Sequence, residues 1–145
     1  MGTVRDNILF GMPYDAEKYK RIVFACALER DFTILEHGDL TQIGERGINL
    51  SGGQQQRIAL ARAVYSDADI LLLDSPLSAV DQNTSNHIFQ YCLKEYLQGK
   101  TVVLVTHQLQ ILHSCDLIGI MDKGKLVYFG GYQSDVMAKH FTVWR

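Results

Sequence analysis

A glycine-rich segment near the middle of this 145-residue chain has the residue types needed to bind a phosphate group. It consists of Leu50, Ser51, Gly52, Gly53 and Gln54. Ser51 followed three residues later by Gln54 is a capping-box pattern, which predicts that a helix begins here. The first turn of a helix carries unpaired backbone N–H groups and a positive dipole end, so it attracts anions. Taken alone, the segment could equally be an ordinary capped helix start with flexible glycines.

Two apolar runs end in polar side chains that could complete such a site. Residues 70–73 are followed by Asp74, and residues 102–105 are followed by Thr106 and His107. Short uninterrupted apolar runs are typical of parallel strands covered on both faces, and ligands of such folds bind beyond the carboxyl ends of the strands. Asp74 is therefore a candidate to hold Mg²⁺ through water, and His107 would face the same crevice. The plainer alternatives are a strand-terminal carboxylate and a packed core histidine.

The elements that would position these groups alternate between helices and strands. The strand at residues 70–73, a helix over 83–97 and the strand at 101–105 form a strand–helix–strand crossover. A mostly apolar helix is expected from Ser51 to about residue 64. The other expected elements are an extended stretch at 2–10, a helix over 15–28, a short helical turn at 32–35, a loop at 41–47, a hairpin over 117–129 that turns at Lys123 and Gly124, and a helix over 132–140.

The bulk composition limits the function classes. An apolar content of 47% allows one globular core, and a net charge of −2 argues against a nucleic-acid partner. Cys26, Cys92 and Cys115 lack metal-ligand spacing and suit free thiols in a reducing compartment. The longest apolar runs are far below the roughly 18 to 20 residues that span a bilayer. The first residues lack the features of a signal peptide.

Together, these groups resemble the second half of the nucleotide-binding domain of ABC transporters. Residues 50–54 resemble the signature loop, Asp74 ends a Walker B-like strand, residues 78–81 ending in Asp81 resemble the D-loop, and His107 resembles the switch histidine. The resemblance implies a partial P-loop-type α/β ATPase core with an α-helical subdomain, and ATP and Mg²⁺ as cofactors. It also implies that the signature loop completes an ATP site held mainly by a second nucleotide-binding domain.

Two further segments narrow the resemblance. Gly44, Glu45, Arg46 and Gly47 resemble the X-loop of exporters, which touches the intracellular loops of the transmembrane domains. This favours an exporter at the cytoplasmic face of a membrane over a soluble ABC ATPase of repair or translation. Residues 2–11 and 76–81 resemble the first cassette of the multidrug-resistance-associated, or C, subfamily, over essentially the whole chain. The helical subdomain would span about residues 12–65 and the ATPase core about 66–145.

The chain departs from the family pattern in two ways. Ser75 stands where competent cassettes carry the glutamate that polarises the attacking water, so hydrolysis at this cassette's own site is expected to be slow or absent. No G-x-x-x-x-G-K-[ST] loop and no Q-loop glutamine occur, so the chain alone is expected to bind ATP barely and to be inactive. Without the strand of that loop, the strand at 101–105 would keep an open edge or pair directly with the strand at 117–121.

Two functions fit these observations. The first is the cassette of an ATP-driven transmembrane exporter, an ATPase when intact, which supplies the signature half of a composite ATP site. The alternative is a non-enzymatic truncated cassette that docks on an intact ABC protein.

Overall fold

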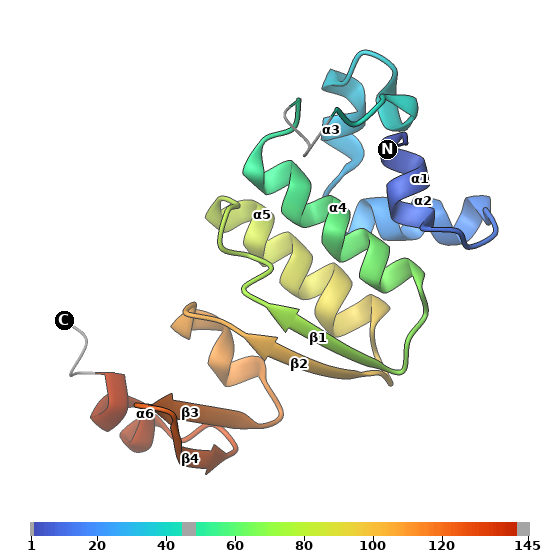
Figure 1. Cartoon of the computed structure of the whole chain (residues 1–145). Coiled ribbons are helices and arrows are strands. Elements are labelled where there is room, and N and C mark those ends of the chain that lie inside the picture. Colours follow the sequence, from blue (N-terminus) through green and yellow to red (C-terminus); the bar gives the residue numbers. More distant parts are fainter. Residues whose placement is uncertain (1, 45–48, 142–145) are drawn as a thin grey trace. The chain divides into compact units, whose positions relative to one another are not determined.

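The computed structural model describes residues 2–44 and 49–141, and it divides into two compact units, Met1–Thr106 and His107–Arg145. The elements are shown in Figure 1. In chain order they are α1 (Val4–Leu9), α2 (Ala16–Ala25), α3 (Glu29–Ile34), η1 (Gly38–Leu40), α4 (Gly52–Tyr65), β1 (Ile70–Asp74), α5 (Gln82–His87), η3 (Ile88–Tyr96), β2 (Thr101–Val105), η4 (Leu109–Ser114), β3 (Ile118–Asp122), β4 (Lys125–Gly130) and α6 (Ser134–Phe141). The expected mixed α/β fold class is confirmed.

The first residues of the chain form a helix, so the expectation of an extended stretch at 2–10 was wrong. A capping box begins α1: the Asp6 N–H donates to Thr3 Oγ1 at 3.0 Å, and the Thr3 N–H donates to Asp6 Oδ2 at 2.8 Å. The Val4 and Ile8 side chains, four residues apart, are fully buried. The local cap and the helical spacing together outweigh the mixed polarity of the segment.

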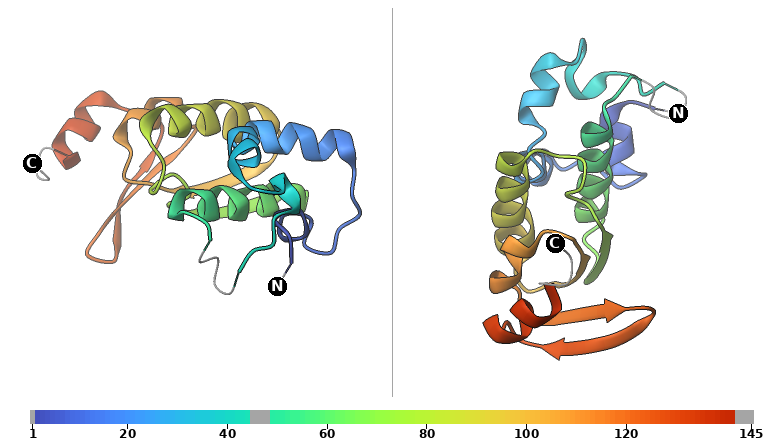
Figure 2. Two further views of the ribbon diagram at one scale, coloured as in Figure 1. Left: turned by 90° about the horizontal axis from the view of Figure 1, so that it is seen from above. Right: turned by 90° about the vertical axis from the view of Figure 1, so that its left-hand side faces the viewer.

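The helices of the first unit surround one apolar core. Figure 2 shows α2 running beside η3, and α2 also contacts α4, which in turn contacts α1. Helix α2 ends earlier than expected, because Ala27 adopts a left-handed φ of 55° that a helix cannot contain. Helix α3 therefore begins at Glu29, ahead of the expected turn at 32–35.

Strands β1 and β2 pair in parallel, as expected, and the register runs from Ile70 opposite Thr101 to Asp74 opposite Val105. The crossover between them contains α5, which continues directly into the π-helix η3, and turns join these helices to the two strands. The parallel pairing places the carboxyl ends of both strands at one edge of the sheet, where Asp74 lies.

The expectation that both faces of these strands are covered was wrong. Leu71 and Leu73 are buried in the helical core, whereas Ile70 and Leu72 are 62% and 77% exposed. Val103 on β2 is also exposed. Within the described part of the first unit, the helices pack on one face of the sheet only, so an apolar pattern suited to two covered faces leaves one of them open.

The second unit is a hairpin with a terminal helix. Strands β3 and β4 are antiparallel, and Lys123 and Gly124 take φ values of 46° and 76°, as a tight hairpin turn requires. Leu112, Ile118 and Met137 form its small core. Within the described residues β2 pairs only with β1, and β3 pairs only with β4. Of the two expected outcomes for the strand at 101–105, an open edge or direct pairing with the strand at 117–121, the structure shows the open edge. Within residues 2–44 and 49–141, every helix is too short or too polar to cross a bilayer.

Candidate functional site

The glycine-rich segment begins α4 with the expected capping box. The Gln54 N–H donates to Ser51 Oγ at 3.2 Å, and the Ser51 N–H donates to Gln54 Oε1 at 2.8 Å. The cap leaves the N–H groups of Gly52 and Gly53 in the first turn, and no described residue accepts a hydrogen bond from either. Two backbone donors at the positive end of a 14-residue helix are thus available to an anion.

These amides border an open pocket of about 380 Å³. One wall is the start of α4 and the other is the segment that follows β1. The lining residues are Ser51, Gly52, Gly53, Arg57, Ala79, Val80 and Asp81. The structure therefore brings together two sequence segments, 51–53 and 79–81, that the sequence analysis selected separately.

The two walls approach each other most closely at Gly53. A Cβ atom at this position would lie 2.7 Å from the carbonyl oxygen of Ala79, which is closer than real side chains come to backbone. At Gly52 the nearest atom to such a Cβ would be the Cβ of Ala79 at 4.0 Å, an ordinary contact. Only Gly53 is therefore required by packing; at Gly52 the lack of a side chain keeps the backbone open to the pocket.

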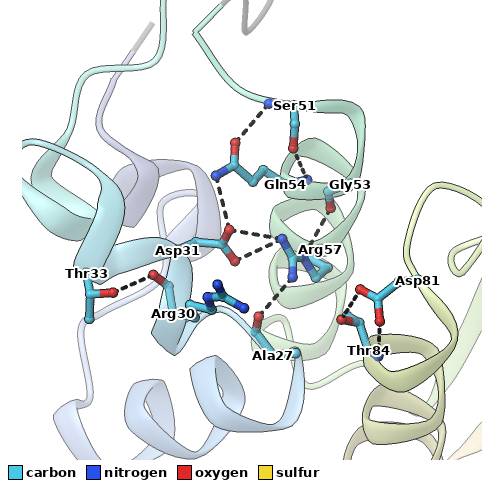
Figure 3. A network of polar contacts seen from close by, with 10 residues as sticks. All are labelled: Ala27, Arg30, Asp31, Thr33, Ser51, Gly53, Gln54, Arg57, Asp81 and Thr84. Carbon is cyan, nitrogen blue, oxygen red and sulfur yellow. Dashed lines mark hydrogen bonds and ion pairs between the residues drawn. The ribbon is translucent and has the colours of Figure 1, made fainter.

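A largely buried ion pair holds the start of α4 against α3 (Figure 3). Arg57 Nη2 lies 2.9 Å from Asp31 Oδ2 and 3.0 Å from Asp31 Oδ1. Gln54 Nε2 donates to the same Oδ1 at 3.0 Å, and Arg57 Nη1 donates to the Ala27 carbonyl at 3.1 Å. The network fixes the direction in which the α4 amides point.

Asp81 and its cap close the other side of the pocket. Its carboxylate begins α5, accepting from the Thr84 hydroxyl at 2.6 Å and from the Thr84 N–H at 3.0 Å. These hydrogen bonds hold the pKa of Asp81 below its usual value, so the carboxylate stays ionised. Its two oxygens are directed to the first turn of α5, which fixes the position of the 79–81 wall.

Asp74 and Ser75 lie at the carboxyl end of β1. The Ser75 hydroxyl donates to Asp74 Oδ1 at 3.2 Å, and the Ser75 N–H donates to the Val105 carbonyl at 3.0 Å. In the described residues no three Cys, His, Asp or Glu side chains gather as a metal cluster. An exposed carboxylate beside a hydroxyl nevertheless fits Mg²⁺, which uses one or two carboxylates, keeps several waters and takes its other ligands from phosphates.

The family model for ABC transporters matches residues 3–78, just over half of the chain. The chain belongs to the ABC transporter family. It is 56% identical over 132 residues to ABC transporter C family member 9 of Arabidopsis thaliana, covering 91% of this chain and 9% of that protein. It is 55% identical over 131 residues to ATP-binding cassette sub-family C member 4 of Homo sapiens, covering 90% and 10%.

A third relative is the probable multidrug resistance-associated protein lethal(2)03659 of Drosophila melanogaster, 54% identical over 133 residues, covering 92% of this chain and 10% of that protein. The resemblance to the multidrug-resistance-associated, or C, subfamily is thus confirmed. This ABC chain spans about a tenth of the length of these curated relatives.

The other predicted site residues of this ABC chain fall outside the pocket lining. Leu50 is buried and anchors the segment in the core, and the Gln54 side chain is engaged by Ser51 and Asp31. His107 is exposed and is the first residue of the second unit, so its expected meeting with Asp74 stays a prediction.

The loop that resembles the X-loop is described at one end only. The Gly44 N–H donates to the Asn49 side chain at 3.1 Å. Glu45, Arg46 and Gly47 lie outside the described residues. The assignment of this loop to the transmembrane domains therefore stays a prediction.

Sequence reasoning missed Asp31, Arg57 and Gln56 as parts of this ABC site. Arg57 joins Asp31 across 26 residues of chain, and Gln56 joins Ser78 across 22 residues. The signal that could have marked Gln56 and Arg57 is that these polar residues directly precede the buried apolar residues of α4.

Adding one methyl group at each glycine is expected to separate packing from helix propensity. Gly53→Ala is expected to lower the free energy of unfolding by about 1–3 kcal/mol, because its Cβ overlaps the Ala79 carbonyl. Gly52→Ala, the matched control, is expected to be neutral or to stabilise by up to about 1 kcal/mol, because alanine favours the helix and space is available. Urea denaturation followed by circular dichroism measures both. Equal effects at the two positions would contradict the close approach.

Proposed function

We propose that this chain is part of an ATP-driven exporter, in which it supplies one half of a composite nucleotide site. The observation that carries the proposal is the pocket between the Gly52 and Gly53 amides and the 79–81 wall. Those amides suit a terminal phosphate whose nucleotide is anchored mainly on a second cassette. Ser51, which also lines the pocket, adds its hydroxyl to the same wall.

Asp74, Ser75 and His107 would form this cassette's own, weaker site. Asp74 would hold the Mg²⁺ that bridges and neutralises nucleotide phosphates. The Ser75 hydroxyl next to it donates to Asp74 and has no basic group to take a proton from water at neutral pH. The asymmetry supports a cassette that assists hydrolysis at its partner's site and is poor at its own.

The proposed partners follow from the same assembly. They are a second nucleotide-binding domain, which faces the pocket, and the intracellular loops of transmembrane domains, which would meet residues 44–47. The chain would then lie at the cytoplasmic face of a membrane as part of an integral membrane transporter. Its relatives carry the names of ABC transporters of the C family and of a multidrug resistance-associated protein.

A negative charge placed at Gly52 tests this function, because it has opposite effects on folding and on phosphate binding. Aspartate at the first position of a helix interacts favourably with the helix dipole, so Gly52→Asp is expected to leave the fold intact. The same carboxylate occupies the pocket where a phosphate would bind and repels it. ATP-dependent substrate uptake by membrane vesicles that carry the intact transporter is expected to fall at least about tenfold.

Gly52→Asn is the matched control, since it has nearly the same shape without the charge. It is expected to retain several times more uptake and more vanadate-trapped nucleotide than Gly52→Asp. Equal uptake by the two variants would mean that no phosphate approaches these amides, and the proposed function would be wrong.

A further inference from the structure

The Gln56 side chain connects the two walls of the pocket, which are the start of α4 and the segment after β1. Its Oε1 accepts from the Ala79 N–H at 3.0 Å, and its Nε2 donates to Ser78 Oγ at 2.7 Å and to the Ser75 carbonyl at 3.4 Å. The side chain is half-buried and points from α4 to the segment after β1. One amide group thus contacts three residues of that segment with both of its polar ends.

The position of Gln56 in α4 gives these contacts a consequence. It lies one turn after Gly52 and Gly53, so it moves with the helix that presents the two amides. Ala79, which it holds, belongs to the opposite wall, and Ser75 follows Asp74. A displacement of the start of α4 is therefore transmitted to both the pocket wall and the end of β1 through one side chain.

Gly53 makes this arrangement tight. The backbone of α4 meets the Ala79 carbonyl without room for a Cβ, while the Ala79 N–H is held by Gln56. Both polar groups of the peptide units at Ala79 therefore face α4. Without the Gln56 side chain, the Ala79 peptide would lose its hydrogen bond to α4 and keep the close contact at Gly53, which does not fix the direction of the peptide.

We propose that Gln56 is a positioning residue, which holds residues 75–79 against α4 and so sets the geometry of the phosphate pocket. The proposal rests on the proposed function. Gln56 is absent from the pocket lining, and its side chain contacts Ala79, Ser78 and Ser75, so it acts through that segment. It ties the half-site offered to a partner's nucleotide to the end of β1 in the cassette's own half-site.

Amide hydrogen exchange in the 145-residue chain tests the contact itself. Gln56→Met keeps the length of the side chain and removes both polar ends, so the Ala79 amide is expected to exchange at least about fivefold faster. Gln56→Glu keeps the acceptor, so exchange at Ala79 is expected to stay near that of the unsubstituted chain. Gln90→Met removes an amide that donates to Glu95 instead, and it is the control for loss of a glutamine. Unchanged exchange at Ala79 in Gln56→Met overturns the proposal.

ATP turnover by the intact transporter tests the consequence. Gln56→Met is expected to lower kcat about tenfold and to leave the KM for ATP within about twofold, since the nucleotide is anchored mainly on the partner. Gln56→Glu is expected to recover part of kcat, and Gln90→Met to leave kcat unchanged. A rise in KM with an unchanged kcat, or no change in either, overturns the positioning role.

Failure of this inference and failure of the proposed function give different results. If Gly52→Asp and Gly52→Asn transport equally, the composite site is wrong and Gln56 has no such site to position. If they differ as expected and Gln56→Met turns over normally, the composite site stands and the role of Gln56 is wrong.

Discussion

Ser75→Glu is expected to raise ATP turnover at this cassette's own site by about 10²- to 10⁴-fold in the intact transporter. The position follows directly after Asp74, at the end of β1 where the nucleotide phosphates would lie. A carboxylate there can orient a water molecule and accept its proton, which the hydroxyl cannot do. Ser75 already has a left-handed φ of 50° although it carries a Cβ, so replacing it with glutamate adds no new backbone strain.

The measurement must separate the two nucleotide sites. Vanadate trapping with a photoreactive ATP analogue, followed by proteolytic separation of the cassettes, reports turnover at each site. Ser75→Gln is the matched control, because it has the size of glutamate without the ability to accept the proton. If glutamate and glutamine gave the same trapping, Ser75 would not be the residue that limits this site.

Asp31→Asn is expected to lower the free energy of unfolding by about 3 kcal/mol. The substitution removes the charge opposite Arg57 and leaves the shape, so the guanidinium stays in the interior without a counter-charge. The side chains of Arg57 and Asp31 are only 14% and 11% exposed, so water replaces little of the lost interaction. Gln54 also loses its carboxylate acceptor, and the cap of α4 is expected to loosen with it.

A surface ion pair provides the control for this loss. Asp69, 96% exposed, pairs with Lys100 at 3.0 Å, and Asp69→Asn is expected to cost less than about 1 kcal/mol. The double substitution Asp31→Leu with Arg57→Met removes both charges and is expected to be more stable than Asp31→Asn alone. Urea denaturation gives all three values. Equal losses for Asp31→Asn and Asp69→Asn would show that the Asp31 pair is no more important than a solvated one.

The sequence predicted what local signals encode. Helix α4 was predicted because Ser51 and Gln54 form its cap within four residues, and β1 and β2 were predicted because their apolar runs are short and uninterrupted. A similar cap, Thr3 with Asp6, precedes α1 and was overlooked because the segment around it is of mixed polarity. The type of an element was therefore predicted correctly where a helix cap or a hydrophobic pattern was taken into account.

What the sequence could not provide was the set of contacts between distant segments. The pocket was predicted only as separate halves, and nothing near Gly53 in the sequence indicates that the Ala79 carbonyl lies against it. The pairing of Asp31 with Arg57 depends equally on how α3 packs on α4. The burial of β1 was overestimated because an apolar run does not say which of its faces meets a neighbour.

The half-open sheet of the first unit has a consequence for how that unit comes apart. Within the described part of the first unit no helix covers Ile70, Leu72 or Val103, so that unit stabilises its strands mainly through the face that packs on the helices. Detaching these strands is expected to cost less free energy than separating the helices, whose Val4, Ile8 and Ile22 side chains are fully buried. Within the first unit, loss of structure is therefore expected to start at β1 and β2, while the helices still hold the amides of Gly52 and Gly53 in place.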